Sequence, residues 1–519
     1  MEEMKVSRRG SRLPLRNATV STPAHQELVN IAVQRASDSR KRLELLFDST
    51  ETTIAPASPL QTLLECGNAV IKLLIQVAES IQNHKGDFHL VIARLEDLIN
   101  LATEKFYAFP FKDVPAGWRV LFRESSLLKV SALSVKSVWS QSDQDKKSSQ
   151  LCLGLSETEL DEIVKTIDTA LIMAGPPPSD AGQAEISTLF RILQNINDAS
   201  SENDLDEPAA KRQKLNSRTS PYKATFPQST VFVPPISRPV PRIATLTFDR
   251  FEKHMQNPQS TALGPEPLII TGTLDHWPAR NERPWNRPSY LMSKTIGGRR
   301  LVPIELGRSY VDEGWGQKII SFREFMEQYI LYIQEPGGLA TGYLAQHDLF
   351  AQIPSLRQDI AVLDYCYTSP PPAHQSSPLA EKHSMNPQLD EPLLNAWFGP
   401  AGTISPLHVD PYHNILTQVV GRKYIRLYAP RESTKLYARG VEDGGVDMEN
   451  TSALDIGVLA GWDGTEDEQL EAREKFPLFK QAEYVDCILE DGECLYIPVG
   501  WWHYVRSLSV SFSVSFWWN

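Results

Sequence analysis

Cysteine is scarce in this sequence, and long apolar runs are missing. The five cysteines lie far apart and none forms a CxxC pair, which argues against a zinc ribbon or a redox dithiol and fits a reducing compartment. The longest apolar stretches, such as residues 69–78, are interrupted by Lys72 and Gln76, so we expect no membrane span. The first thirty residues are charged and lack an apolar core, so we expect no secretory signal.

Positive charge is also in deficit. The 519 residues include 52 lysines and arginines against 64 aspartates and glutamates, which gives a net charge of −12. This balance argues against direct binding of nucleic acid and suits a basic protein or peptide as a partner. Hydrophobic residues make up 41% of the chain, enough to bury large cores, and the length allows two or three domains.

The N-terminal part is predicted to be helical. Residues 1–22 are polar and basic, which predicts a disordered tail, whereas residues 23–197 space their apolar residues as helices do. Ser156 and Glu159 form a capping box before one apolar run. Helices are expected at residues 60–81, 88–102, 156–171 and 185–196. In the second of them, the predicted buried stripe is Leu90, Ile92, Leu95, Leu98, Ile99 and Ala102.

Residues 198–242 have the composition of a linker. They are rich in serine, asparagine, aspartate, proline and lysine and hold few large apolar residues. Within them, residues 208–215 read Pro-Ala-Ala-Lys-Arg-Gln-Lys-Leu. A compact basic cluster opened by proline is typical of a nuclear import signal, so we expect residence in the nucleus, with the cytoplasm as a second compartment. The alternative is a solvated run of charge that balances the acidic residues around it.

From residue 243 onward the pattern changes to short strands, turns and aromatic residues. Nine of the eleven tryptophans lie at or after Trp277. Strands are predicted at residues 268–271, 414–420, 423–428 and 508–518, and a helix at residues 322–332. The last strand alternates apolar residues with serines and therefore has two distinct faces. Many short strands between glycine and proline turns indicate a jelly roll, so the chain is predicted to be an α+β protein with a β-domain over residues 243–519.

Two stretches interrupt this pattern and are expected to be surface loops. Residues 368–391 are rich in proline, serine and histidine, and we expect His374 and His383 within them to face solvent. Residues 440–474 are acidic and rich in glycine, and a helix is predicted at their end.

His408 and Asp410 stand two positions apart in a predicted strand. Residues at this spacing point to the same side of a strand, so one strand can present two ligands to one ion, and Pro411 would end the strand there. His503 is the best third ligand, because it follows a tight Pro-Val-Gly-Trp-Trp segment and precedes a strong strand. Two histidines and one carboxylate hold non-haem Fe(II) and leave positions open for a cosubstrate and oxygen.

Two alternatives to this metal site stay open from the residues alone. His-X-Asp is a common tripeptide, and it can be a hydrogen-bonded histidine followed by an aspartate in a turn. His413 is a rival ligand, although it lies just past the turn at Pro411.

Lys423 is the candidate partner for the cosubstrate. It follows the turn at Gly421 and alternates with Ile425 and Leu427, the residues expected to face inward. A buried lysine costs several kcal/mol unless it is paired, and the distal carboxylate of a keto diacid would pair with it. In the alternative register, Tyr424 faces inward and Lys423 lies in solvent.

Four longer segments carry a resemblance to a known family. Residues 397–410, 421–430, 497–506 and 512–518 closely resemble JmjC (Jumonji C) domain proteins. Within that family the chain is most similar to the lysine-specific demethylase 8 branch, whose members are also described as protein arginyl hydroxylases. The resemblance extends from residue 243 to the C-terminus and includes residues 301–305 and 341–347.

This resemblance implies a fold and a set of site residues. The fold is a double-stranded β-helix, a jelly roll of the cupin type. The implied Fe(II) ligands are His408, Asp410 and His503. The implied 2-oxoglutarate residues are Lys423, Tyr343, Ser405 and Asn414. The implied substrate pocket is formed by Glu305, Trp315 and Trp397, and a carboxylate with aromatic faces suits a guanidinium or an ammonium group.

The sequence departs from the family at the two inserted stretches, at the bulky Tyr412 and His413, and at Gly500 and Trp501. These departures leave the expected metal and cosubstrate positions intact, so they bear on the substrate alone.

The resemblance also implies a dioxygenase that uses Fe(II) and 2-oxoglutarate and acts on a protein side chain. We expect hydroxylation of an arginine in a basic protein, such as a histone tail or a ribosome- or chromatin-associated protein, because a pocket that encloses a guanidinium leaves little room for a methylated ammonium. The first alternative is demethylation of histone N-methyl-lysine by the same chemistry. The second is a non-catalytic chromatin-binding module with a degenerate cupin, against which the intact ligand set argues.

Overall fold

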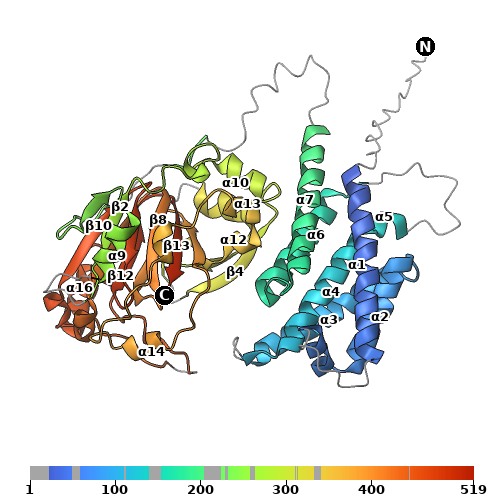
Figure 1. Ribbon diagram of the computed structural model, residues 1–519, viewed down its shortest axis with the longest axis horizontal. Helices are drawn as coiled ribbons and strands as arrows, with labels where there is room; N and C mark the ends of the chain where they lie inside the picture. Colours follow the sequence, from blue (N-terminus) through green and yellow to red (C-terminus); the bar gives the residue numbers. More distant parts are fainter. Residues whose placement is uncertain are drawn as a thin grey trace, which may run out of the picture. The chain divides into compact units, whose positions relative to one another are not determined.

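The computed structural model describes residues 23–48, 59–109, 113–139, 154–203, 224–227, 232–256, 264–309, 311, 314–331, 341–442 and 445–519. These residues form two compact units that divide between residues 206 and 207, the first helical and the second rich in strands (Figure 1). The predicted fold class is therefore confirmed. The predicted tail at residues 1–22 and the basic cluster at residues 208–215 lie outside the described residues.

The N-terminal unit is built around one almost fully buried helix. Its elements are α1 (Pro23–Asp48), the 3₁₀ helix η1 (Pro59–Cys66), α2 (Asn68–Asn83), α3 (Phe88–Ala108), α4 (Ala116–Ser134), α5 (Lys136–Trp139), α6 (Glu157–Ala174) and α7 (Asp180–Asn203). Helix α4 packs against α1, α3, α6 and η1, which explains why it is buried on nearly all sides. The predicted capping box is confirmed, because Ser156 and Glu159 bond to each other's backbone at the start of α6.

Three predictions for this unit were wrong in detail. Residues 60–81 do not form one helix: η1 and α2 meet at an angle of 115°, at Gly67, whose φ of 94° interrupts a right-handed helix. Leu90 is 47% exposed and Val91 is buried in its place, so the buried stripe of α3 begins one residue later. Helix α7 continues to Asn203, into the segment predicted as a linker.

Within the described part of the chain, no single helix combines the length and the apolar composition needed to cross a membrane. Among the same residues, only the sharply bent pair η1 and α2 meets both criteria when taken together. Helix α2 packs Ile71, Leu74 and Val77 into the core of the helical unit.

The C-terminal unit contains two facing sheets. The strands are β1 (Arg242–Ala244), β2 (Leu268–Thr271), β3 (Leu301–Leu306), β4 (Gly316–Ser321), β5 (Gly342–His347), β6 (Leu393–Gly399), β7 (Ile404–Val409), β8 (His413–Val420), β9 (Lys423–Tyr428), β10 (Tyr484–Leu489), β11 (Cys494–Ile497), β12 (Trp502–Ser507) and β13 (Ser511–Trp518). One sheet has nine strands in the order β1-β2-β11-β8-β13-β6-β5-β3-β4, and the other has four in the order β10-β9-β12-β7. Two such sheets, one over the other, form the predicted jelly roll.

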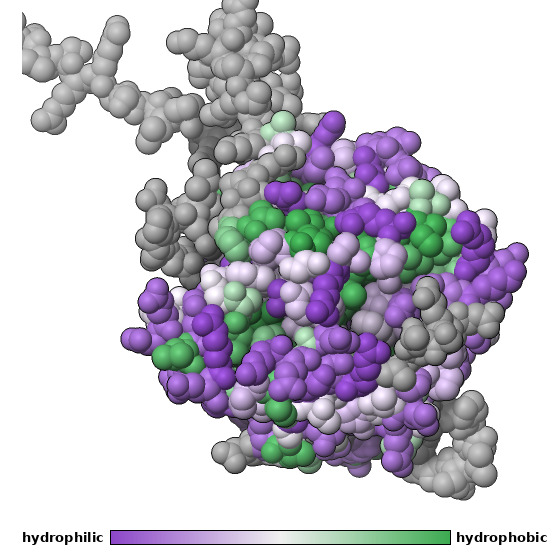
Figure 2. Space-filling view, turned by 90° about the vertical axis from the view of Figure 1, so that its left-hand side faces the viewer, coloured by the Kyte–Doolittle hydropathy of each residue, from purple (hydrophilic) through white to green (hydrophobic). Residues whose placement is uncertain are grey.

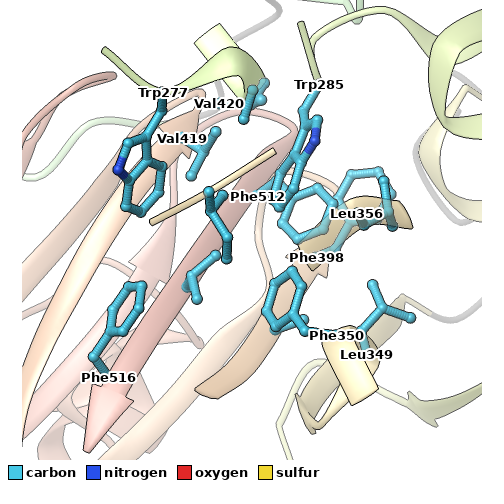
Figure 3. Packing of buried hydrophobic residues seen from close by; sticks show 14 of the residues in the cluster. Trp277, Trp285, Leu349, Phe350, Leu356, Phe398, Val419, Val420, Phe512 and Phe516 are labelled. Carbon is cyan, nitrogen blue, oxygen red and sulfur yellow. The ribbon is translucent and has the colours of Figure 1, made fainter. Parts of the chain in front are cut away.

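Helices cover the outer face of the nine-stranded sheet. The helices that do so are α9 (Phe248–Gln256), α10 (Pro288–Lys294), α12 (Leu349–Gln352) and α13 (Pro354–Arg357). Figure 3 shows Phe512 of β13 beside Trp285 and Phe398, whose ring centroids lie 4.5 and 4.6 Å from its own. The serine face of β13 is buried as well, because it points into the space between the sheets, where Ser513 donates to Gln418.

Strand β9 has the predicted register. Ile425 and Leu427 pack between the sheets with Leu416 and Val505, while Tyr424 and Tyr428 pack on the outer face of the four-stranded sheet. The alternative, with Tyr424 inward and Lys423 in solvent, is wrong.

Other predicted segments needed correction. The helix predicted at residues 322–332 is α11 (Phe322–Phe325) followed by a wider π turn, η4 (Met326–Ile330), and residue 332 lies outside the described part. Two residues of the predicted linker, Phe226 and Val240, belong to the core of the C-terminal unit. Phe226 packs against Phe398, and Val240 donates its N–H to the carbonyl of Asp486.

The two inserted stretches are more than surface loops. The first holds α14 (Ala380–Ser384), and the second holds α15 (Ile456–Leu459) and α16 (Glu466–Lys475). Leu454 and Ile456 of the second stretch are buried against the outer face of the four-stranded sheet. The side of the molecule that carries α16 and β10 is drawn in Figure 2, where hydrophilic residues cover most of the surface around a band of hydrophobic ones.

Replacing Gly421 with alanine is expected to destabilise the fold by about 3 kcal/mol or more. Gly421 joins β8 to β9 with φ at +74°, and an added Cβ would lie 2.0 Å from the carbonyl oxygen of Val510. Gly402 is the matched control: its φ is +88°, but a Cβ there meets no atom within 4 Å, so alanine should cost about 1 kcal/mol from backbone strain alone. Urea denaturation measures both, and equal losses would contradict the predicted clash.

Candidate metal centre and cosubstrate pocket

The three predicted metal ligands meet between the two sheets. His408 on β7 is the cross-strand partner of His503 on β12, and Asp410 follows β7. Nε2 of His408 lies 3.6 Å from Asp410 Oδ1, and Nε2 of His503 lies 3.4 Å from Asp410 Oδ2. All three ligand atoms lie within 4.8 Å of one another, so one ion could contact them together.

Backbone carbonyls orient both imidazoles. Nδ1 of His408 lies 2.7 Å from the carbonyl oxygen of Pro406, and Nδ1 of His503 lies 3.2 Å from that of Trp501. Each Nδ1 can therefore carry the proton and donate it, which leaves each Nε2 lone pair free for a metal. Asn414 donates its side-chain N–H to Asp410 Oδ2 at 2.7 Å and fixes the carboxylate in turn.

The surroundings keep His503 in the form that binds metals. Burial, and then the neighbouring His408, lower the pKa of His503 to about 4. The imidazole is therefore neutral at physiological pH, as coordination requires. Two imidazoles and one carboxylate, oriented by their neighbours, fit a divalent iron ion.

A bulge in the pairing of β12 with β7 widens the set of residues that face the pocket. The register shifts between His503 and Val505, so Val505 pairs with Ser405. Bulges of this kind re-aim side chains beside active sites. Here Ser405 and His408, three positions apart, both line the same pocket.

The pocket next to the triad is lined by Tyr343, Trp397, Ser405, His408, Asp410, Asn414, Leu416, Lys423, Ile497, His503 and Val505. Leu416, Ile497 and Val505 were not predicted from the sequence. Strand periodicity could have found two of them, because Leu416 follows Asn414 and Val505 follows His503 by two positions.

Lys423 is a buried basic residue in this pocket, and its charged form is destabilised by burial. It is 1% exposed, and its Nζ donates to the hydroxyl of Tyr343 at 3.2 Å. No carboxylate among the described residues forms an ion pair with it, and burial lowers its pKa to about 7. A bound carboxylate would restore its positive charge.

Neutral polar groups complete this end of the pocket. Tyr343 forms a side-chain hydrogen bond with Ser405, and burial raises its pKa, so the hydroxyl stays protonated. The side-chain oxygen of Asn414 is buried without a hydrogen-bond partner in the described part of the protein. Donors at one end and the three candidate metal ligands at the other would suit a small keto diacid.

The three residues expected at the substrate pocket lie on neighbouring strands or beside them. Glu305 on β3 is the cross-strand partner of Tyr343, and it forms a side-chain hydrogen bond with Trp315, which is 37% exposed. Burial raises the pKa of Glu305, and no basic side chain among the described residues pairs with it. Trp397 lines the pocket itself, 6.1 Å from the ring of Tyr343, and donates to Ser515.

The other histidines considered in the sequence, His374, His383 and His413, are not part of the candidate metal centre. His413 points away from the metal site: Nδ1 lies 2.9 Å from the hydroxyl of Tyr496 and Nε2 lies 2.9 Å from the carbonyl oxygen of Pro371. The expectation that His374 and His383 face solvent was wrong, because both are half-buried. His383 lies near enough to Asp410 for that carboxylate to act on its pKa, and Nδ1 of His374 bonds with Ser376.

Comparison with known proteins shows similarity to cupin-like and lysine demethylase proteins. A family model described as a cupin-like domain matches residues 255–519. The chain is 35% identical over 436 residues to "Lysine-specific demethylase 8" of Danio rerio, covering 84% of this chain and 89% of that protein. That alignment is longer than the C-terminal unit, so it includes part of the helical unit.

Other relatives align with about half of this chain. The chain is 43% identical over 253 residues to "Lysine-specific demethylase JMJ30" of Arabidopsis thaliana, covering 49% of this chain and 50% of that protein. It is 25% identical over 269 residues to the human "Bifunctional peptidase and (3S)-lysyl hydroxylase JMJD7", covering 49% of this chain and 77% of that protein. The names of these relatives include both demethylation and hydroxylation.

Proposed function

The chain belongs to the JmjC proteins of the cupin-like family, and from that premise we propose that it hydroxylates the side chain of an arginine in a basic protein. JmjC proteins typically use Fe(II) and 2-oxoglutarate, and the chain is an oxygenase of this class. The observation that carries the choice of a cationic substrate is the half-buried carboxylate of Glu305, which has no basic partner among the described residues; arginine is preferred because its guanidinium can donate two parallel hydrogen bonds to that carboxylate.

The triad has the residues needed to hold iron. Nε2 of His408, Nε2 of His503 and the Asp410 carboxylate would hold Fe(II), which together with 2-oxoglutarate and oxygen would supply the oxidising power needed to insert one oxygen atom into a C–H bond. Pro406 and Trp501 hold the imidazoles through their carbonyls. Asn414 keeps the carboxylate turned toward them.

Lys423, Tyr343, Ser405 and Asn414 form the proposed 2-oxoglutarate site. The Lys423 ammonium pairs with the distal carboxylate, and the Tyr343 hydroxyl, 3.2 Å from Nζ, can turn its proton toward the same oxygen. Leu416 and Ile497 exclude water from the chain of the cosubstrate. Because the pairing is buried, it is stronger than the same contact in water.

Glu305 is the proposed partner of the substrate cation. A guanidinium beside it would hold the carboxylate in its charged form and could donate two parallel hydrogen bonds. Trp397 and Trp315 offer aromatic faces to the same group. The substrate side chain would thus be held with a C–H bond directed toward the metal site.

Demethylation of N-methyl-lysine is the second candidate, favoured by the names of the Danio rerio and Arabidopsis thaliana relatives. The same carboxylate and aromatic residues would accept a methylated ammonium. The non-catalytic alternative is set aside, because the ligand set is complete and the chain is an enzyme of this family.

Mass spectrometry separates the two chemistries. Purified protein is incubated with Fe(II), 2-oxoglutarate and matched peptides that contain either unmodified arginine or methylated lysine. The proposal expects gain of one oxygen on arginine peptides without formaldehyde. Loss of methyl groups with release of formaldehyde, and no oxygen gained on arginine, would overturn it in favour of demethylation.

Replacing Glu305 with glutamine is expected to raise the KM for an arginine peptide by about 10- to 100-fold, the loss of one charge-assisted hydrogen bond. The KM for 2-oxoglutarate should stay within about twofold, because Glu305 lies outside the pocket around Lys423. Glu282→Gln, at an exposed position, is the control. An unchanged peptide KM in Glu305→Gln would remove this residue from substrate binding.

The proposed partner is a basic protein or peptide, such as a histone tail or a ribosome- or chromatin-associated protein, and the proposed compartment is the nucleus. The net charge of −12 and the basic cluster at residues 208–215 support these proposals. Fluorescence microscopy of the tagged chain, with and without alanines at Lys211 and Arg212, tests the location.

A further inference from the structure

The edge of β7 that faces away from β12 forms backbone hydrogen bonds with two separate segments. Strand β7 is the last strand of its sheet. Along one half, the second inserted stretch pairs with it: Val409 donates to the carbonyl of Asn450 at 2.9 Å, and Ser452 donates to that of Leu407 at 2.8 Å. At its start, Ile404 donates to the carbonyl of Arg308 at 3.1 Å. Arg308 lies in the turn after β3, three residues beyond Glu305.

Ion pairs connect these two segments. Nη2 of Arg308 lies 2.6 Å from Asp455 Oδ2, and Nη1 lies 3.2 Å from Asp463 Oδ2. Both acidic residues belong to the second inserted stretch. Asp463 also accepts from Nη1 of Arg506 through both oxygens, at 2.9 and 2.8 Å. Arg506 stands on β12, three residues after His503.

Hydrogen bonds with neighbouring backbone groups hold both aspartates in place. Asp455 accepts from the N–H groups of Gly457 and Val458 at the start of α15. Asp463 donates its N–H to the carbonyl of Gly457. Gly457 also leaves room for the Asp463 carboxylate, because a Cβ added at Gly457 would lie 2.0 Å from Asp463 Oδ2. The side chains of Asp463 and Arg506 are 16% and 11% exposed. Charged groups that are largely buried and fixed on both sides make stronger pairs than exposed ones do.

Trp462 anchors the same turn on the sheet. Its ring lies 5.2 Å from that of Tyr424 on β9, and the Arg426 guanidinium lies 4.7 Å from its centroid. The turn is therefore fixed to β9 through Trp462 and to β12 through Asp463. Arg308 extends this arrangement toward the strand that carries Glu305, because it follows β3 in the chain.

We propose that Asp463 is a positioning residue for substrate binding: by joining Arg308 to Arg506, it holds the strand that carries Glu305 at a fixed place relative to the metal ligands on β7 and β12. This rests on the proposed function, in which Glu305 binds the substrate cation. The second inserted stretch thus acts on the substrate site through Arg308.

Asp463→Asn and Glu471→Gln form a matched pair for the test. Each removes one negative charge from the same inserted stretch, but Glu471 is exposed on α16 and has no hydrogen bond or ion pair among the described residues. Hydrogen–deuterium exchange of the full chain should be at least about tenfold faster at residues 301–309 in Asp463→Asn and unchanged in Glu471→Gln. Unchanged exchange at residues 301–309 in Asp463→Asn would overturn the proposal.

Kinetics show whether the role is positioning. With an arginine–glycine repeat peptide, Asp463→Asn should raise the peptide KM about tenfold and leave the KM for 2-oxoglutarate and peptide-free succinate formation within about twofold. Arg308→Lys, which keeps the charge but loses the planar fork, should lie between the wild type and Asp463→Asn. An equal loss of peptide-free turnover would mean that the metal strands are disturbed, which contradicts the proposal.

The wild type separates this inference from the proposed function. If it forms succinate but leaves arginine peptides unmodified, the proposed substrate is wrong, and the exchange data still decide whether Asp463 holds the strand. If arginine is hydroxylated and the peptide KM of Asp463→Asn equals that of the wild type, only the inference fails.

Discussion

Replacing His408 with alanine is expected to lower the conversion of 2-oxoglutarate to succinate by more than about a hundredfold. Changing a residue that only supports a metal ligand already costs about 10- to 100-fold in affinity or activity, so removing a ligand should cost more. His408 is one of the three proposed ligands, and its Nε2 lies 3.6 Å from Asp410 Oδ1. Iron content after dialysis and succinate formation are measured together, and both should fall.

The control for this experiment is His276→Ala, because His276 is exposed and lies outside the pocket. Chelation should inactivate the wild type, and added Fe(II) should restore it, whereas His408→Ala should not recover. Full activity in His408→Ala would mean that His408 is not needed to hold the metal, and the proposed centre would have to be abandoned.

Two of the three proposed metal ligands, His408 and Asp410, could be predicted because their geometry is local. His408 and Asp410 share one side of one strand through period-two alternation, and His503 precedes a strongly patterned strand. Lys423 could be predicted for the same reason, since its neighbours Ile425 and Leu427 needed a buried face. For His408, Asp410 and Lys423 the signal was a short-range pattern, whereas His503 meets the other two only through the pairing of β12 with β7.

The connection through Asp463 could not be predicted. Arg308 and Asp463 stand 155 positions apart, and neither belongs to a periodic run. The second inserted stretch reads as an acidic loop, yet its Ser452 pairs with Leu407 in β7. Edge pairing through isolated backbone hydrogen bonds leaves almost no trace in composition, so the loop interpretation missed it.

Helix boundaries failed for a different reason. The apolar spacing of residues 60–81 continues through Gly67, so periodicity alone predicts one helix. The backbone at Gly67 has φ at 94°, which ends one helix and starts another at a sharp angle. In α3, which of Leu90 and Val91 is buried depends on the face of the helix that packs against α4. That face is set by tertiary packing, which the spacing of apolar residues does not show.

Lys423→Met is expected to inactivate the enzyme and to stabilise the protein free of cosubstrate. The loss of turnover should reach about a hundredfold or more at limiting 2-oxoglutarate, because the distal carboxylate loses a buried charged partner worth about 3 kcal/mol. The same charge has no ion-pair partner among the described residues until cosubstrate binds, and its pKa is lowered from 10.5 to about 7. Removing it should stabilise the fold near neutral pH by on the order of 4 kcal/mol.

The pH dependence distinguishes this explanation from a simple gain in packing. Between pH 7 and pH 10.5 the unfolded chain holds the Lys423 proton and the folded chain does not. The stability contributed by this group therefore rises with pH across that window, by about 1.4 kcal/mol per unit, and is lowest below pH 7. The advantage of Lys423→Met should accordingly shrink as the pH is raised.

Urea denaturation of the cosubstrate-free protein at several pH values measures this difference, with Lys480→Met as the exposed control. A constant advantage at all pH values would mean that the methionine side chain merely packs better and that burial does not destabilise the charged form of Lys423. A stability gain that shrinks with pH, together with lost turnover, would instead mean that the fold accepts an unfavourable buried cation because the cosubstrate pairs with it. Added 2-oxoglutarate with Fe(II) should then stabilise the wild type and leave Lys423→Met almost unchanged.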